Sequence, residues 1–255
     1  MPQLLDDYIA ELEITRGRCG WGGDHDKIDY VLARARDHTR TGRRALEIGL
    51  GDGYLMDRLC TLGLNYTGVD ISRTLIEHQQ GRARAAGLDV TLHCASAAEL
   101  PVAPGSADVA FALDVLEHLS PPDYLATLAR LHAALAEGGV LIGTVPFREN
   151  LVASLVRCEE CGHEFHRVGH QQAFDWTYLR DSLERHFDIL RVAMVQLVGH
   201  WGLTRRVGHA LTTPARRVKH WLLARHDPQR VLDPGGTCYF IARRRPGPDD
   251  RAHGD

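Results

Sequence analysis

The stretch ALEIGLGDGYL, residues 45–55, decides the fold because it joins an apolar run, a glycine-rich turn and the start of an amphipathic helix. Gly49, Gly51 and Gly53 alternate in the turn, where a side chain would collide with anything that the backbone approaches closely. A strand, a glycine turn and a helix in this order predict the first unit of a parallel α/β sheet, with a ligand site at the turn.

The same alternation of short apolar runs and amphipathic patterns continues along the chain. The runs that predict strands are residues 44–50, 65–72, 89–94, 107–114, 140–146, 188–198 and 237–244. The patterns that predict helices are residues 54–63, 73–87, 121–139 and 174–187. Strands that alternate with helices indicate an α/β fold, with a doubly wound sheet of seven strands covered on both faces.

Composition limits the function classes. The chain has 255 residues, a formal net charge of −3, 25% charged residues and 44% hydrophobic residues. These values are ordinary for a soluble globular protein, and they argue against a nucleic-acid binder, which usually carries a positive excess. The acidic amino terminus lacks the pattern of a signal peptide, and scattered cysteines indicate thiols in a reducing compartment. We therefore expect a cytoplasmic protein.

Residues 1–243 are expected to form a single domain. Residues 1–42 are predicted to form an N-terminal helical cap, and two insertions interrupt the α/β pattern at residues 147–172 and 199–236. Residues 244–255 lack an apolar anchor, which is typical of a disordered tail.

A second signal for the ligand lies at Asp70, at the end of the second predicted strand. A carboxylate there can accept hydrogen bonds from both hydroxyls of a ribose, although it could instead cap the next helix. The glycine spacing is G-x-G-x-G, not the G-x-G-x-x-G of dinucleotide sites, and Glu47 precedes it by two residues. A glutamate suits a ligand with an ammonium and a sulfonium, so S-adenosylmethionine is favoured over a nicotinamide dinucleotide.

In order and spacing, four stretches resemble the class I S-adenosylmethionine-dependent methyltransferases, in particular the ubiquinone-biosynthesis and small-molecule subgroup. These stretches are LEIGLGDGYL, GVDIS, CASAAELPVAPGSADVAFALDVLEHL and LHAALAEGGVLIGTVP. The resemblance covers about residues 43–198 and the last strand. It implies a Rossmann-like, mainly parallel sheet whose last strand is antiparallel, with S-adenosylmethionine as cofactor.

The resemblance also implies a cofactor site, residue by residue. Its expected members are Glu47, Gly49, Gly51 and Gly53 at the methionine portion, Asp70 at the ribose, Ile71, Ser96 and Ala97 at the adenine, and Leu113 and Asp114 beside the methionine. Relatives often have aspartate where this chain has Ser96. A serine can still bond the adenine ring, although with less charge assistance.

His118, in the LEHL sequence, is the leading candidate for a catalytic base. An unperturbed imidazole titrates near pH 6.5, so it can take a proton from a hydroxyl or ammonium acceptor. A packing and hydrogen-bonding role for His118 in this loop is the alternative interpretation.

The sequence RCEECGHEFHRVGH, residues 157–170, predicts a zinc site. Cys158 and Cys161 have the C-x-x-C spacing, and His166 and His170 complete a set of four ligands, with His163 as a competitor for one position. Four protein ligands close a zinc site, which indicates a structural role. Because the insertion follows the fifth strand, we expect the zinc-bound loop to form a wall of the substrate pocket.

Residues 199–230 hold six arginines and one lysine against one aspartate, a local charge of +6. Three interpretations stay open: peripheral contact with the inner face of a membrane or a lipid-linked substrate, recognition of a phosphate-bearing small molecule, or a solvated helical face. The leading hypothesis is methyl transfer to a small-molecule, glycan or lipid-linked acceptor in bacterial biosynthesis. The alternative is a zinc-containing nucleic-acid-binding protein or an RNA methyltransferase. The oligomeric state stays open.

Overall fold

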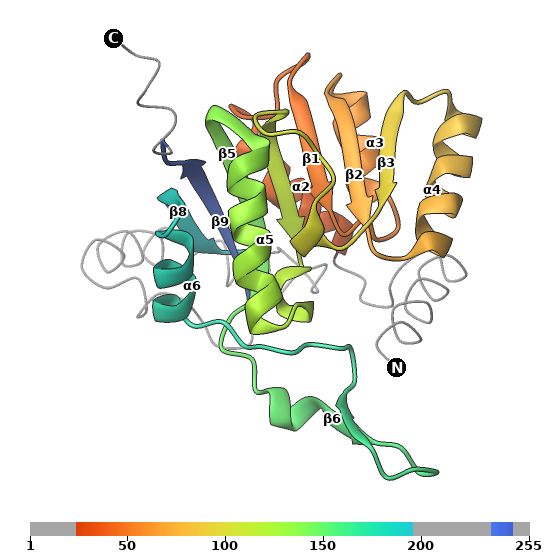
Figure 1. Cartoon of the computed structure of the whole chain (residues 1–255), viewed down its shortest axis with the longest axis vertical. Helices are drawn as coiled ribbons and strands as arrows, with labels where there is room; N and C mark the ends of the chain where they lie inside the picture. The colour runs from red at the N-terminus through yellow and green to blue at the C-terminus, as the bar shows by residue number, and fades with distance from the viewer. Residues whose placement is uncertain (1–23, 196–235, 247–255) are drawn as a thin grey trace, which may run out of the picture.

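The computed structural model describes residues 24–195 and 236–246, and it is built on one seven-stranded sheet (Figure 1). The strand order is β3-β2-β1-β4-β5-β9-β8. The strands are β1 (Arg44–Ile48), β2 (Asn65–Asp70), β3 (Val90–Cys94), β4 (Ala107–Leu113), β5 (Leu135–Pro146), β8 (Phe187–Met194) and β9 (Thr237–Arg244). Strand β9 pairs antiparallel with both β5 and β8, and the remaining pairs are parallel. The predicted doubly wound sheet, with an antiparallel last strand, is confirmed.

Five helices of eight or more residues lie in the described part of the chain. They are α2 (Asp24–Ala35), α3 (Tyr54–Thr61), α4 (Arg73–Ala86), α5 (Pro121–Ala134) and α6 (Trp176–Leu183). Short 3-10 turns are η1 (Ala97–Glu99), η2 (Leu116–His118) and η3 (Leu151–Ser154). Side chains cap several of the helices, because Ser72, Ser120 and Asp175 each accept a hydrogen bond from a backbone N–H of the first turn.

The helix expected over residues 121–139 ends earlier, at Ala134. Leu135 already belongs to β5, where it is fully buried and pairs with Ala107 of β4. The pairing shifts register between Ala107 and Val109, and Gly138 takes a positive φ of 68° within the same stretch. Burial of Leu135 in the sheet therefore outweighs the helical pattern of the sequence around it.

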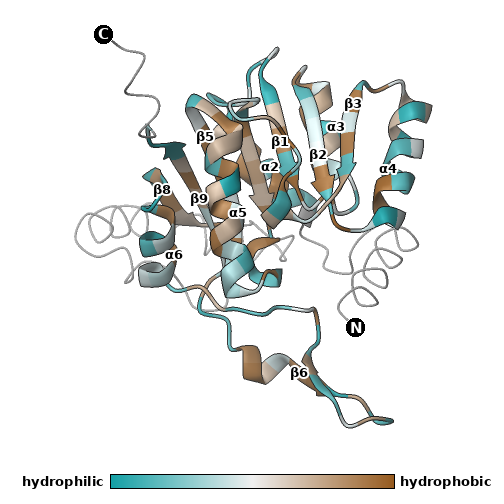
Figure 2. Cartoon of the chain, in the orientation of Figure 1, coloured by the Kyte–Doolittle hydropathy of each residue, from teal (hydrophilic) through white to brown (hydrophobic). Residues whose placement is uncertain are grey.

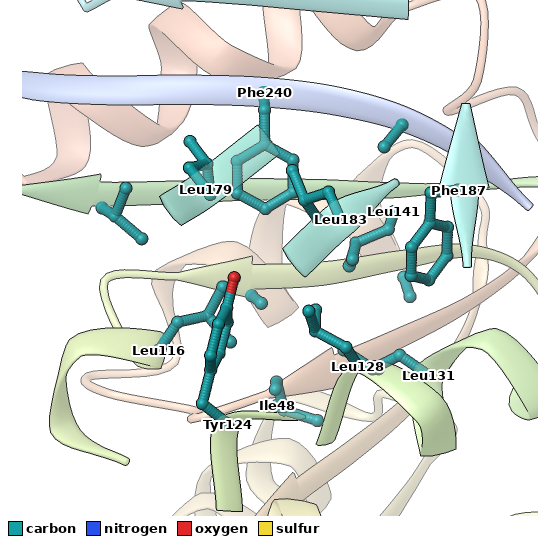
Figure 3. Close-up of a cluster of buried hydrophobic side chains, with 14 of the residues drawn as sticks. Ile48, Leu116, Tyr124, Leu128, Leu131, Leu141, Leu179, Leu183, Phe187 and Phe240 are labelled. Carbon is teal, nitrogen blue, oxygen red and sulfur yellow. The ribbon is translucent and has the colours of Figure 1, made fainter. Parts of the chain in front are cut away.

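Alternation along the strands sends side chains into two cores, one on each face of the sheet. Leu46 and Ile48 of β1 pack with α5 and α6, while Ala45 packs with α2 and α3. Figure 3 shows the first core, where side chains of α5 and α6 meet those of β5 and β9; it includes Leu128, Leu131, Leu141, Leu179, Leu183 and Phe240. The hydropathy colouring places apolar residues along the strands and polar ones on outward helix faces (Figure 2).

The predicted insertion at residues 147–172 contains a β-hairpin that extends from the main body below the sheet (Figure 1). Its strands are β6 (Leu155–Arg157) and β7 (Glu164–His166), which pair antiparallel. The strand arrows of β1, β2 and β4 point toward the same edge of the sheet, and the hairpin lies at that edge (Figure 1). Ligand sites of such sheets lie at that edge.

The second predicted insertion and the predicted tail fall largely outside the described residues. This applies to residues 199–235 of the basic insertion, to residues 247–255 of the tail and to residues 1–23 of the expected N-terminal cap. Within residues 24–195 and 236–246, no helix has the length and apolar character that crossing a bilayer requires.

Candidate active site

The glycine turn follows β1 and leaves no room for side chains. A Cβ atom on Gly49 would lie 2.8 Å from Val115 Cγ2, and one on Gly53 would lie 2.5 Å from Gln79 Oε1. Both glycines also have positive φ angles, 75° and 79°, which residues with side chains rarely adopt. Glycine is therefore favoured at both positions of this turn, where Gly49 is half-buried and Gly53 is buried.

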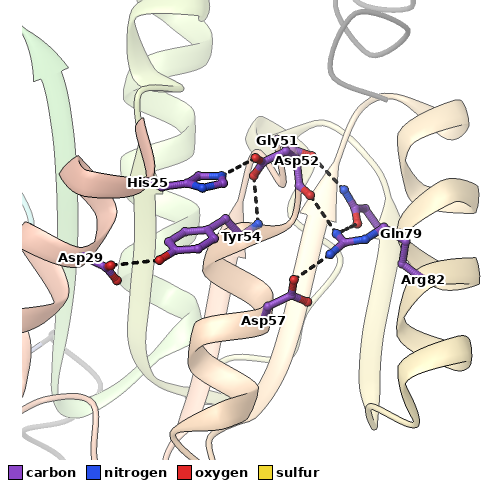
Figure 4. A network of polar contacts seen from close by, with 8 residues as sticks. All are labelled: His25, Asp29, Gly51, Asp52, Tyr54, Asp57, Gln79 and Arg82. Carbon is purple, nitrogen blue, oxygen red and sulfur yellow. Dashed lines mark hydrogen bonds and ion pairs between the residues drawn. The ribbon is translucent and has the colours of Figure 1, made fainter. Parts of the chain in front are cut away.

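Side chains of α4 fix the outer side of this turn (Figure 4). Gln79 Nε2 donates to the carbonyl oxygen of Gly51 at 2.9 Å, and Arg82 donates to the carbonyl oxygen of Asp52 at 2.8 Å. Arg82 also pairs with Asp57 of α3 at 2.6 Å. These contacts hold the turn in one conformation from the side that faces away from β4.

Helix α2 holds the other side of the turn (Figure 4). His25 Nε2 lies 2.5 Å from Asp52 Oδ2, and its ring stacks on Tyr54 with the centroids 3.8 Å apart. The Tyr54 hydroxyl donates to Asp29 Oδ2 at 2.9 Å. The contact of His25 with the glycine turn depends on the path of α2, which its sequence does not reveal.

Asp70 ends β2 beside the glycine turn, as the sequence predicted. Its Oδ2 accepts from the Leu50 backbone N–H at 2.9 Å, and its Oδ1 accepts from the Ser72 backbone N–H at 2.8 Å. Ser72, not Asp70, caps α4. The carboxylate is thus oriented by two backbone N–H groups at the edge of the sheet.

The residues expected at the adenine line the same edge. Ile71 is 59% exposed, unusual for a large apolar side chain that follows a buried strand. Ser96 caps η1 by accepting from the Ala98 backbone N–H at 3.2 Å, and Ala97 begins that turn. The Ser96 hydroxyl can still donate a hydrogen bond, because capping uses only its oxygen lone pair.

Glu47 lies under the glycine turn and is almost fully buried. The hydroxyl of Tyr66, on the neighbouring strand β2, donates to Glu47 Oε2. Burial raises the pKa of Glu47 well above its usual value, although the Tyr66 hydrogen bond opposes that shift. A cationic group near this carboxyl would favour its charged form.

Asp114, the residue after β4, has a φ of 52°, a conformation that is uncommon for a residue with a side chain. Thr144 Oγ1 accepts from its backbone N–H at 2.9 Å and donates to its Oδ1 at 2.8 Å. Lys27 of α2 forms an ion pair with Asp114 Oδ2. Leu113 precedes Asp114 and is half-buried. The sequence reasoning missed Lys27 and Thr144, and only the rarity of lysine, with two in the chain, marked Lys27.

His118 ends η2, four residues after Asp114. Its ring meets that of His170 edge to face, with the centroids 4.8 Å apart. Burial, with the nearby His170, lowers the pKa of His118 to about 4, so it is a neutral hydrogen-bonding group near pH 7. Glu117 beside it is 1% exposed, and burial and Asp114 raise its pKa well above the usual value. The sequence reasoning gave Glu117 and Glu149 no role.

The structure does not bring the four predicted zinc ligands together. Cys158 and Cys161 lie at the hairpin tip, where backbone N–H groups and the Cys161 thiol lower the pKa of Cys158. His166 pairs with Leu155, three residues from Cys158, so about 10 Å of strand separates the two ends of the hairpin. His166 and His170 instead surround Glu149, at 3.5 Å and 2.5 Å. The exposed His163 stacks on Phe165.

Comparison with known proteins finds a match to one protein family. Residues 45–139 match the family model described as a methyltransferase domain. This match runs from β1 to the first residues of β5 and includes the glycine turn.

Two curated proteins are similar to part of this chain. The chain is similar to the ubiquinone biosynthesis O-methyltransferase of Xanthomonas campestris pv. campestris, with 30% identity over 116 residues, 45% of this chain and 46% of the relative. It is 35% identical over 155 residues to the 27-O-demethylrifamycin SV methyltransferase of Amycolatopsis mediterranei. This match covers 56% of each chain. The chain thus spans about half the length of the curated relatives it matches.

Solved structures share the fold over more of the chain. The 1,6-didemethyltoxoflavin-N1-methyltransferase of Burkholderia thailandensis, with S-adenosylhomocysteine bound, has a TM-score of 0.64 and 18% identity, covering 96% of this chain and 88% of that one. The [4+2]-cyclase SpnF has a TM-score of 0.62 and 22% identity, covering 91% and 84%. At these identities the likeness shows the fold alone.

Proposed function

We propose that this protein transfers a methyl group from S-adenosylmethionine to a hydroxyl oxygen of a small molecule. The observation that carries the proposal is the pairing of bare glycine backbone after β1 with the Asp70 carboxylate after β2. The two curated relatives are a ubiquinone biosynthesis O-methyltransferase and a 27-O-demethylrifamycin SV methyltransferase, and both names support oxygen as the acceptor atom.

The residues present fit the cofactor. Gly49 and Gly53 keep the turn free of side chains, and two backbone N–H groups orient the Asp70 carboxylate that is proposed to bind the ribose. Ile71 offers an exposed apolar face for a planar base. Glu47 provides a buried carboxyl whose charge a cationic amino acid portion would stabilise. When bound, S-adenosylmethionine supplies an electrophilic methyl group on a sulfonium.

The acceptor side is proposed to lie between the end of β4 and the hairpin. Asp114 and His118 come from that end, and the acceptor hydroxyl is proposed to lie beside His118. Gln171 and Gln172 fasten the segment after β7 to η2, which supports the hairpin as one wall. A methyl displacement needs chiefly this alignment of the acceptor oxygen with the methyl carbon.

The test is calorimetry with S-adenosylhomocysteine, followed by label transfer from methyl-labelled S-adenosylmethionine to a panel of polyphenols and hydroxylated macrolactams. We expect one binding site per chain and label recovered as a methyl ether. Absence of cofactor binding would refute the proposal. Binding without transfer to any acceptor, as for a cyclase that uses the same fold, would refute the methyl-transfer part.

Contacts beyond the small molecule stay proposals. The +6 segment, residues 199–230, lies outside the described residues, and its charge supports a phosphate-bearing or lipid-linked acceptor. Cosedimentation with phosphatidylglycerol vesicles and with duplex RNA, each over a salt series, separates these partners. The structural zinc predicted on Cys158, Cys161, His166 and His170 is an alternative proposal to the arrangement seen here, in which His166 and His170 lie beside Glu149. Loss of bound metal in the Cys158→Ser variant would favour that alternative.

A further inference from the structure

Three side chains that bind metals in other proteins converge beside the proposed acceptor position. Glu117 and His118 come from η2, and His170 comes from the segment after β7, more than fifty residues later. One ligand atom of each of these residues lies within 4.8 Å of those of the other two. Glu117 Oε2 is buried and has no hydrogen-bond partner among the described residues. An unpaired buried carboxylate oxygen is costly unless a cation or proton donor satisfies it.

The two histidines are oriented as metal ligands usually are. His170 Nδ1 lies 2.5 Å from Glu149 Oε2, and because a carboxylate only accepts, Nδ1 carries the proton and Nε2 keeps its lone pair. The backbone carbonyl of Gly169 accepts a hydrogen bond from the His118 ring, so one His118 nitrogen also stays available. A carboxylate or carbonyl on the far nitrogen fixes the tautomer and orientation of a ligating histidine.

His166 supports this arrangement instead of joining it. Its Nδ1 accepts from the backbone N–H of His170 at 3.1 Å, so a neutral ring carries its proton on Nε2. That Nε2 lies 3.5 Å from Glu149 Oε1. This Nε2 is buried and makes no hydrogen bond among the described residues, so His166 lies beside Glu149 without fixing it, while Glu149 orients His170.

Hydrogen bonds fasten this cluster to the ligand edge of the sheet. The Gln171 backbone N–H donates to the Glu117 carbonyl oxygen at 2.8 Å, and Gln171 Nε2 donates to the His118 carbonyl oxygen at 2.6 Å. Gln172 Nε2 donates to the carbonyl oxygens of Leu116 and Leu119, both at 3.0 Å. Since η2 closely follows the end of β4, the cluster lies near the glycine turn and not at the tip of the hairpin.

We propose that Glu117, His118 and His170 bind a divalent transition metal ion of the zinc type, and that the hydroxyl oxygen of the methyl acceptor takes the remaining coordination position. Two histidines and one glutamate suit zinc, and three protein ligands leave a position open. The role of the acceptor rests on the proposed function, whereas the metal site does not.

The chemistry needs no further reactant. A zinc-type ion lowers the pKa of a bound hydroxyl, as it lowers that of bound water to about 7. The hydroxyl proton passes to water, and the oxygen forms a bond to the methyl carbon. The bond between that carbon and the sulfonium sulfur breaks, with its electron pair left on sulfur.

The first experiment titrates the chelator-treated full chain with Co²⁺ as a visible probe, followed by competition with Zn²⁺. We expect one Co²⁺ per chain, with visible absorption from nitrogen and oxygen ligands and no sulfur-to-metal charge-transfer band. Glu117→Gln and His170→Ala should each weaken Co²⁺ binding about 100-fold or more, because each removes a ligand. Glu149→Gln should weaken it about 10- to 100-fold through loss of orientation.

The matched control is the double variant Cys158→Ser/Cys161→Ser, which removes the thiols predicted to bind zinc and should keep the Co²⁺ affinity of the parent chain. The proposal would be overturned by a sulfur-to-metal charge-transfer band that this variant abolishes, if Glu117→Gln binds Co²⁺ as the parent chain does. The absence of any stoichiometric Co²⁺ binding would also overturn it. Circular dichroism and binding of S-adenosylhomocysteine show that each variant is folded.

Failure of the proposed function is distinguishable from failure of the metal site. If the chain binds Co²⁺ but not S-adenosylhomocysteine, the metal site would be upheld and the proposed binding of S-adenosylmethionine would be refuted. Methyl transfer that continues unchanged after complete chelation would overturn the role of the metal in acceptor binding. Transfer lost on chelation and restored by Zn²⁺, at unchanged affinity for S-adenosylhomocysteine, is the result expected.

Discussion

Asp114 is held in a left-handed backbone conformation by Thr144, the buried residue opposite the last residue of β4. The Thr144 hydroxyl both accepts from the Asp114 backbone N–H and donates to its carboxylate, at 2.9 and 2.8 Å. One side chain on β5 thereby fixes the direction in which the chain leaves β4 toward η2. The position of His118 depends on this turn.

Thr144→Val should lower the free energy of unfolding by about 1–3 kcal/mol, because it removes both hydrogen bonds that the Thr144 hydroxyl makes with Asp114 at nearly constant volume. Urea unfolding measures the change. The control is Thr127→Val, which removes a buried hydroxyl with no hydrogen-bond partner among the described residues. That variant should be as stable as the parent or more so, and equal losses in both variants would contradict the role assigned to Thr144.

Asp70→Asn should raise the dissociation constant of S-adenosylhomocysteine about tenfold to hundredfold, as expected when one hydrogen bond to a charged acceptor is lost. Isothermal titration calorimetry measures this constant. Asp89→Asn, the same change at an exposed residue near the opposite end of β3, should leave it unchanged. An unaffected Asp70→Asn variant would show that this carboxylate does not bind the ribose.

His25→Phe keeps a ring that can stack on Tyr54 but removes the contact with Asp52. Because a hydrogen bond to a carboxylate contributes about 1.5 kcal/mol, cofactor binding should weaken about tenfold as the glycine turn loses this restraint. His163→Phe on the exposed hairpin is the matched control. Equal affinities in a fluorescence titration would mean that α2 does not organise the turn.

Asp108 receives hydrogen bonds from the backbone N–H and the guanidinium of Arg44, and the Arg44 side chain lowers its pKa. A depressed carboxylate pKa stabilises the fold above the unfolded value of about 3.9, and that stability is lost as pH falls through the folded value. Since Arg44 is 45% exposed, Asp108→Asn should cost about 1 kcal/mol at pH 7.

The measurement for Asp108→Asn is urea unfolding at several pH values. The difference between parent and variant should shrink as pH falls below about 3.9, because the parent then protonates Asp108. A difference that stays constant down to pH 2 would show that the ion pair is not its source.

Local patterns in the sequence were enough to predict the sheet. The runs around Leu46 and Phe240 are apolar on both sides because their strands are buried on both faces, and such runs are readable without any knowledge of contacts. The positions of Gly49 and Asp70 were equally predictable, because the proposed role of each residue depends on its position relative to the end of a strand. The end of α5 could not be predicted in this way, because burial of Leu135 in the sheet outweighs the helical pattern of the sequence.

The sequence by itself determined the α/β fold and the edge of the sheet at which the cofactor site is proposed, because strand and helix periodicities and the residues at strand ends are local properties. Only the tertiary structure decided which distant side chains meet. The antiparallel register of the hairpin moves His166 away from Cys158, and the return of the chain to η2 brings His170 to Glu117. Such meetings depend on where the chain returns in space, and a spacing of cysteines and histidines along the sequence does not contain that information.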